Sequence, residues 1–257
     1  GAAVALSPLR SGAFNGGISA LDASYILQSI AGRRTLDADA SAACDATGNG
    51  TLSTLDATRI LEFAVGMRAA LPVAQSCGSD WLFIPEPAAA AGQQTTQPST
   101  VGTCVRGAIA FAALPASASD QDFRAALFGD CTGNWQPPGG AAFSRGGAPL
   151  TLGPALAARG QLRVPLRLRG GQALELVLRA DPARLRFVTA RAGDGAVVRA
   201  RSSADGRVRI AAASATSLGA ARLVVLFDRL DATATLGDVT VEYASLDEAP
   251  LATRKSR

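Results

Sequence analysis

Oxygen-bearing side chains recur along the segment from residue 45 to residue 56. Counted from Asp45, they stand at positions 1, 3, 5, 9 and 12, and a glycine at position 6 permits a sharp turn. This pattern suits calcium, a hard cation that takes about six to eight oxygen ligands, with a backbone carbonyl at position 7. The sequence therefore predicts a calcium loop. Its ligands would be Asp45, Thr47, Asn49, the Thr51 carbonyl and Asp56.

A weaker copy of this pattern lies 34 residues earlier. Residues 15–32 and 49–66 are identical at nine of 18 aligned positions, which marks an internal repeat. In the earlier copy Ser11 and Ala13 occupy positions 1 and 3, where strong ligands belong. We expect this site to be weak, or completed by water or by another group. Its remaining candidate ligands are Asn15, the Gly17 carbonyl, Ser19 and Asp22.

Each loop leads into a segment with helical spacing. In the second copy Leu55, Ile60 and Leu61 share one helical face, and Gly66 is placed to end the helix. An aspartate at the last loop position also suits the positive end of such a helix. The simpler alternative is a pair of tight turns capped by aspartate, with no bound ion.

The duplicated pattern of residues 11–68 resembles dockerins, the calcium-binding modules that attach secreted proteins to cohesins. The resemblance implies two loop–helix motifs packed antiparallel, with calcium needed for folding. It also implies that the residues just before the last ligand help to select the partner. Here those residues are Ala20, Leu21, Thr54 and Leu55. The missing acid at positions 11 and 13 departs from the family pattern.

All four cysteines lie in the first 131 residues: Cys44, Cys77, Cys104 and Cys131. An even number without a Cys-x-x-Cys pair predicts disulfides formed in an oxidising compartment, rather than a thiolate metal site. The sequence by itself leaves the pairing of the four cysteines open. Because short loops close most readily, we favour the sequential pairing Cys44–Cys77 and Cys104–Cys131.

The middle of the chain predicts a small disulfide-linked segment over residues 72–147. Strands are expected within 77–87, 105–114 and 122–128, and residues 88–100 have the low complexity of an exposed loop. Residues 130–135, Asp-Cys-Thr-Gly-Asn-Trp, repeat the start of the calcium loop. Trp135 replaces the turn glycine there and no acid follows at position 12, so we favour a plain turn over a partial cation site.

From residue 148 the pattern changes to a period of two. Leucines and valines alternate with arginines in short runs separated by Gly- and Asp-containing turns, which predicts antiparallel strands of a β-sandwich. The outward arginines indicate a solvated face in preference to a basic stripe for polyanions, and we expect no nucleic-acid partner. Residues from about 150 to 247 resemble cohesin modules, most specifically at the Asp181-Pro182 turn. The resemblance implies a jelly-roll sandwich.

Composition limits the chemistry. The 257 residues include no histidine and a single lysine, which excludes Ser-His-Asp catalysis and His-ligated zinc. Only five glutamates are present, none beside a second acid in a recognisable motif, so we expect no enzyme. No apolar run reaches the roughly 18 residues of a membrane-spanning helix.

These features predict a multidomain α+β protein. We expect a calcium-binding module over 1–71, the middle segment over 72–147 and the sandwich over 148–257. Residues 1–150 carry 8 basic and 11 acidic side chains, and residues 151–257 carry 17 and 10, so the halves have net charges of −3 and +7. Opposite charges suit mutual docking.

We therefore expect an extracellular or cell-surface assembly protein with cohesin- or dockerin-type protein partners. Those partners include other copies of the chain, joined head to tail into filaments. The alternative is a binding module of a larger surface protein that recognises a separate partner or a glycan.

Overall fold

The computed structural model describes residues 2–113, 115, 117–137, 150–193, 195–220 and 222–251. The chain forms two compact units, and each is built from segments that are separate in the sequence. Unit 1 contains Gly1–Ile18, Leu36–Leu52 and Ala70–Pro138. Unit 2 contains Ser19–Thr35, Ser53–Ala69 and Gly139–Arg257. The units therefore cut across the linear boundaries at 71 and 147 that the sequence suggests.

Unit 1 holds two small antiparallel sheets and two short helices. In one sheet the strand order is β1-β4-β3, and in the other β2 pairs with β5. The core lies around Trp81, Leu127 and Phe128, all nearly inaccessible to solvent. The elements are β1 (Val4–Leu6), α2 (Ala38–Cys44), α4 (Pro72–Cys77), β2 (Trp81–Pro87), β3 (Gln93–Thr96), β4 (Ala108–Phe111) and β5 (Gln121–Leu127).

The strands expected near 77–87, 105–114 and 122–128 are present as β2, β4 and β5. The expectation of a loop throughout 88–100 is wrong in part. Residues Gln93–Thr96 form β3, which pairs with β4 at its edge and leaves three of its four residues exposed. Low complexity did not prevent pairing, because an edge strand needs only backbone partners on one side.

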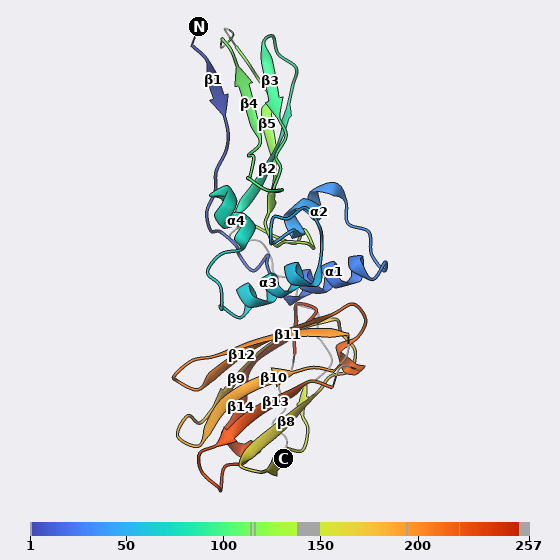
Figure 1. The fold of residues 1–257 in the computed structure, drawn as a ribbon, viewed down its shortest axis with the longest axis vertical. Coiled ribbons are helices and arrows are strands. Elements are labelled where there is room, and N and C mark those ends of the chain that lie inside the picture. Colours follow the sequence, from blue (N-terminus) through green and yellow to red (C-terminus); the bar gives the residue numbers. More distant parts are fainter. Residues whose placement is uncertain are drawn as a thin grey trace. The chain divides into compact units, whose positions relative to one another are not determined.

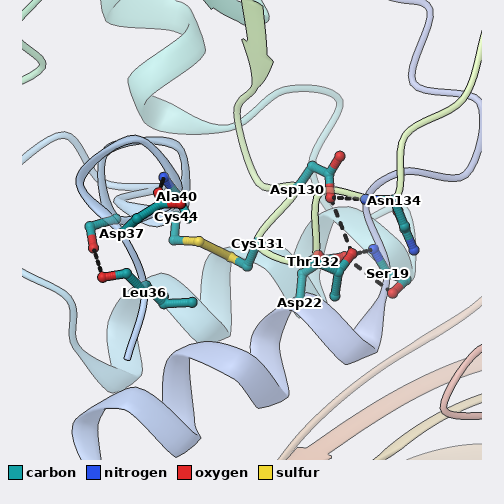
Figure 2. The surroundings of a disulfide bond; sticks show 11 residues. Ser19, Asp22, Leu36, Asp37, Ala40, Cys44, Asp130, Cys131, Thr132 and Asn134 are labelled. Atoms are coloured by element: carbon teal, nitrogen blue, oxygen red, sulfur yellow. Dashed lines mark hydrogen bonds between the residues drawn. A yellow bond between two sulfur atoms is a disulfide. The ribbon is translucent and has the colours of Figure 1, made fainter. Parts of the chain in front are cut away.

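The four cysteines form two disulfides within unit 1, so the predicted oxidised state is confirmed. The sequential pairing is wrong: Cys44 bonds Cys131 and Cys77 bonds Cys104. The reason is tertiary. The backbone N–H of Gly129 donates to the Ala43 carbonyl at 2.8 Å, which fixes the chain after β5 against the end of α2. Cys44 and Cys131 therefore meet, with 5.3 Å between their Cα atoms (Figure 2).

The predicted β-sandwich is confirmed in unit 2 (Figure 1). One sheet has the order β10-β13-β8-β6 with β7 also paired to β8, and the other has the order β11-β12-β9-β14-β15. Their elements are β6 (Thr151–Leu152), β7 (Leu156–Ala158), β8 (Gln161–Arg167), β9 (Ala173–Ala180), β10 (Leu185–Arg191), β11 (Ala196–Ser202), β12 (Arg207–Ser214), η1 (Leu218–Ala220), β13 (Val224–Arg229), η2 (Leu236–Asp238), β14 (Val239–Leu246) and β15 (Ala249–Pro250).

Alternation along the strands builds the sandwich core, as the sequence predicts. Leu162, Val164 and Leu166 of β8 face Leu174, Leu176 and Leu178 of β9 within one buried cluster. Every described member of this cluster comes from the strands and turns of the sandwich. The sandwich therefore has a complete core of its own.

Both predicted helices are present, as α1 (Ala20–Ile30) and α3 (Thr54–Ala64). Ser19 and Ser53 are their N-caps, and in each case the carboxylate of an aspartate three residues later accepts a hydrogen bond from the N-cap backbone N–H. This capping box satisfies backbone N–H groups that a helix start leaves without partners. Gly66, with φ of 77°, follows the end of α3 as predicted. None of the described helices is long and apolar enough to cross a membrane.

Candidate functional site

The candidate calcium loop of unit 1 is folded around the side chain of Asp45. Its Oδ1 accepts hydrogen bonds from Thr47 Oγ1 (3.1 Å), Gly48 N (2.9 Å) and Asn49 N (3.1 Å). Its Oδ2 accepts one from Gly50 N at 2.6 Å. Gly48 and Gly50 have φ values of 74° and 85°, which favour glycine. One carboxylate thus organises the whole first half of the loop.

Residues 130–135 adopt the same arrangement. Asp130 Oδ1 accepts from Thr132 Oγ1 and from Asn134 N, each at 3.1 Å (Figure 2). Asp130 Oδ2 accepts from Trp135 N at 3.0 Å. Gly133 has φ of 67°, matching Gly48. Residues 130–135 therefore form a turn with the same hydrogen-bond pattern as the Asp45 loop. The missing turn glycine does not matter, because the Trp135 backbone N–H still reaches the carboxylate.

The donor set of each loop fits a hard cation. A carboxylate, a threonine hydroxyl and an asparagine amide lie at alternate positions, and all can supply oxygen. Among the described residues no group of three or more His, Cys, Asp or Glu side chains is gathered as a metal centre. Calcium at these loops would therefore depend on neutral oxygens around one acid. Such a donor set favours modest affinity.

The other predicted calcium ligands are distributed between the units. Thr51 belongs to the unit 1 loop, where its N and Oγ1 both donate to Asn49 Oδ1 at 2.9 Å. Ser19, Asp22 and Asp56 belong to unit 2, where they form the capping boxes of α1 and α3. Asn15 and Gly17 belong to unit 1.

The first repeat runs alongside the 130–135 loop within unit 1. Trp135 Nε1 donates to the Ala13 carbonyl at 2.6 Å, and Asn15 Nδ2 donates to the Gln136 carbonyl at 3.1 Å. A Cβ on Gly17 would lie 2.9 Å from the Trp135 Cβ, so only glycine permits this close approach. Neither Ser11 nor Ala13 has a carboxylate side chain. The neighbouring 130–135 loop contains one, that of Asp130.

In unit 2, helices α1 and α3 pack on each other and on the outer face of the sheet formed by β11, β12 and β9 (Figure 1). That face carries small side chains. Ala173, Ala211 and Ala213 alternate with the core residues of β9 and β12, yet they are at most 2% exposed. Buried alanines at outward positions allow close approach of a helix. The run Ala211-Ala212-Ala213 was the signal of a covered face that the sequence analysis missed.

Polar contacts join the helices to this sheet. Ser24 Oγ donates to the Ser214 carbonyl at 3.0 Å, and both residues are buried. Gln28 Nε2 donates to Gln172 Oε1 at 3.0 Å. At the start of α1, Ser19 Oγ donates to Glu248 Oε1 at 2.6 Å. We call this helix-covered face, from Ala173, Gln172 and Glu175 to Ala211, Ala213 and Ser214, the docking face.

Charges reinforce the contact at α3. Arg199 Nε of β11 lies 3.6 Å from Glu62 Oε1 across the interface. Arg199 Nη2 donates to Thr58 Oγ1 at 3.5 Å. Burial by itself would raise the pKa of Glu62, but hydrogen bonds from Arg68 and Arg59 outweigh it and hold the pKa below its ordinary value. Glu62 is therefore an ionised carboxylate that accepts hydrogen bonds from Arg59 and Arg68 and forms an ion pair with Arg199.

Glu175 has the opposite environment. Burial raises the pKa of its carboxyl above the ordinary value of 4.5; the hydrogen bond from Ala20 N opposes the rise, and the charge of Glu248 adds to it. Its Oε1 accepts that backbone hydrogen bond at 3.1 Å. The start of α1 is thus held by a carboxylate that is costly to ionise.

Glu175→Gln should therefore raise the stability of unit 2 at neutral pH. A folded-state pKa above the unfolded value means that the contribution of this carboxyl is fully present below pH 4.5 and is lost as pH rises through the folded value. The glutamine keeps an acceptor for Ala20 N. Urea unfolding of the two proteins should show the variant's advantage at about pH 7 and its disappearance on acidification. An advantage that is unchanged by pH would contradict this.

The four residues predicted to select a partner lie at the starts of the helices. Ala20 is buried, and its N–H is the donor to Glu175 in the chain's own sandwich. Leu21 is half-buried, Thr54 is exposed and Leu55 is 44% exposed. Part of this set therefore contacts the docking face, and part faces outward.

Several outward arginines of the sandwich are paired with carboxylates. Arg179 and Arg207 both bind Glu242, Arg184 binds Asp231 and Asp238, and Arg186 binds Asp228. These pairs support the expectation of a solvated face. A cleft of about 590 Å³ near the end of α3 is lined by three arginines and by Asp205. The three arginines are Arg201, Arg207 and Arg209.

No family model and no curated protein matches this chain. Three solved structures from Acetivibrio cellulolyticus match part of it. A type II cohesin–X–dockerin complex is 11% identical with a TM-score of 0.31, covering 41% of this chain and 92% of its own. A type II cellulosomal cohesin is 13% identical (TM-score 0.28; 42% and 91%), and a scaffoldin cohesin in complex with a dockerin is 14% identical (0.25; 43% and 88%).

Proposed function

We propose that this chain is a non-catalytic, extracellular assembly protein whose calcium-loop helices dock on a β-sandwich. The observation that carries the proposal is the packing of α1 and α3 on the docking face, with hydrogen bonds from Ser24 and Gln28. In this proposal the contact is of the dockerin–cohesin type and is made by residues of one chain. The two disulfides favour an oxidising, extracellular location.

Calcium would act at the loops that lead to the helices. In the second repeat, Asp45, Thr47, Asn49 and the Thr51 carbonyl would bind the ion, and Asp56 would close the set by its place in the sequence. Ion binding by a small loop adds directly to its folding free energy.

The 130–135 loop would complete the first repeat. The first repeat lacks acids at positions 1 and 3, and the later loop offers Asp130, Thr132 and Asn134 in the conformation of the Asp45 loop. The contacts of Trp135 with Ala13 and of Asn15 with Gln136 support this pairing within unit 1. The Gly17 carbonyl would be a further ligand. The group that the degraded repeat needs is thus supplied from about a hundred residues away.

Calcium titration of the full chain should therefore find two sites, with little binding of magnesium. Magnesium demands near-ideal octahedral geometry and keeps its water, whereas calcium accepts irregular oxygen loops. Isothermal calorimetry of metal-free protein gives the stoichiometry, and Asp122→Asn, on an exposed position of β5, is the charge-matched control. A chain that binds no calcium would remove this part of the proposal. One site in place of two would remove the role of the 130–135 loop.

The alternative function rests on the arginine-lined cleft. Arg201, Arg207 and Arg209 would suit an anionic glycan on the surface of a larger assembly, since guanidinium groups pair well with carboxylate and sulfate oxygens. Arg207 is already paired with Glu242 there, which lowers the free positive charge. We therefore rank glycan binding second.

A further inference from the structure

We propose that the docking face is a receptor for the helix pair of a second copy, and that in the resting chain its own α1 and α3 occupy it. This inference rests on the proposed function and adds its partner and its regulation. Copies would join only when the helix pair leaves its own sandwich. The head-to-tail contact expected from the charges is then an exchanged form of the intramolecular contact.

The sandwich does not need the helices for its core. The buried cluster of unit 2 is formed by residues of the sandwich, including Leu176, Ile210 and Phe227, and its described members include no residue of α1 or α3. On the sandwich side, undocking uncovers the outer-face alanines Ala173, Ala211 and Ala213 and the polar groups that bind the helices. Undocking therefore uncovers the docking face and leaves the sandwich core packed.

The contact has the chemistry of a reversible interface. It combines the alanine patch with hydrogen bonds from Ser19, Ser24 and Gln28 and with the Arg199–Glu62 pair. Interfaces between domains that separate are more polar than obligate ones. Each of these polar groups can be solvated when the contact opens, so separation leaves no charge buried.

The backbone N–H groups at the starts of α1 and α3 are hydrogen-bonded within the helical segments themselves. The capping boxes at Ser19 and Ser53 lie within the helical segments, and α1 and α3 contact each other, so the pair can move as one body. In the sequence, the whole segment from residue 70 to residue 138 separates the pair from the sandwich. Neither helix is joined to the docking face by a short turn that would forbid exchange.

The concentration of the chain decides between the intramolecular contact and the contact between two copies. A tethered partner competes at an effective concentration of the order of millimolar, so the intramolecular contact wins in dilute solution. Exchange of an identical element is a low-cost route to oligomers once that contact is weakened. The wild-type chain should therefore be a monomer at micromolar concentration.

The test is complementation between two full-length variants. Ala213→Arg blocks the docking face and leaves the helices intact, because an arginine cannot fit at this fully buried position on the outer side of β12. Ser24→Arg blocks the helix pair and leaves the face intact, because Ser24 is fully buried against Ser214. Both arginines become solvent-exposed when the contact opens, so both variants should fold.

Each variant alone should be monomeric, and an equimolar mixture should form a 1:1 complex in light scattering coupled to size exclusion. Ala157→Arg, on exposed β7, is the matched control and should form no complex with either variant. A mixture that stays monomeric overturns the inference.

Amide hydrogen exchange distinguishes failure of the exchange between copies from failure of the docking contact itself. If both variants lose amide protection in α1 and α3 yet do not combine, the exchange proposal fails while the docking contact stands. If Ala213→Arg leaves that protection unchanged, the docking contact itself is wrong, and the proposed function fails with it.

Discussion

Replacing both Cys44 and Cys131 by alanine should lower the free energy of unfolding of unit 1 by about 4–5 kcal/mol. The disulfide closes a loop with a sequence separation of 87 residues, and the chain-entropy relation gives roughly 4.6 kcal/mol for that length. Cys44 and Cys131 are both buried, so truncation also removes packed sulfur atoms. A loss of this size approaches the whole stability of a small domain.

The matched comparison is the second disulfide. Cys77 and Cys104 are separated by 27 residues, for which the same relation gives roughly 3.6 kcal/mol. Guanidinium unfolding of both double variants, followed by Trp fluorescence, should therefore rank Cys44–Cys131 as the more stabilising bond. The rings of Trp81 and Trp135 lie edge to face within unit 1, with 4.7 Å between their centroids. Their fluorescence therefore follows the unfolding of unit 1 selectively. Equal losses, or the reverse order, would show that the loop-closure argument does not govern this unit.

The second large effect is expected at Asp45. Asp45→Ala removes the acceptor for three backbone N–H groups and for Thr47 Oγ1, and a lost acceptor for partly buried donors costs about 1–3 kcal/mol. It also removes the proposed calcium. At calcium a hundredfold above its Kd, that ion contributes about 2.7 kcal/mol. The variant should thus lose about 4–5 kcal/mol with calcium and only the first part without it.

Unfolding curves with calcium and with chelator distinguish the two contributions. Asp130→Ala should behave in the same way if the 130–135 loop binds an ion, since its carboxylate holds the corresponding groups. Asp122→Asn controls for the loss of one negative charge. If Asp45→Ala is destabilised equally in both conditions, the loop is a capped turn and calcium has no part in it.

Much of the local structure could be predicted from the sequence. The helical spacing of Leu55, Ile60 and Leu61, with Gly66 after them, predicts α3 and, through the repeat, α1, because this spacing depends only on residues within a few turns. The alternation of leucine or valine with arginine predicts the strands of the sandwich, because successive side chains of a strand point to opposite faces. An even number of cysteines predicts that all are bonded.

The non-local decisions could not be predicted in this way. The partner of Cys44 is Cys131 because the chain after β5 is hydrogen-bonded to the end of α2, a contact between residues far apart in sequence. The partner surface of the helices is likewise set by Ala211 and Ala213, whose burial depends on what covers them. Helical spacing and strand alternation need only neighbouring residues, so the sequence determined the elements. Disulfide pairing and helix docking depend on the packing of distant segments, so only the tertiary structure decided them.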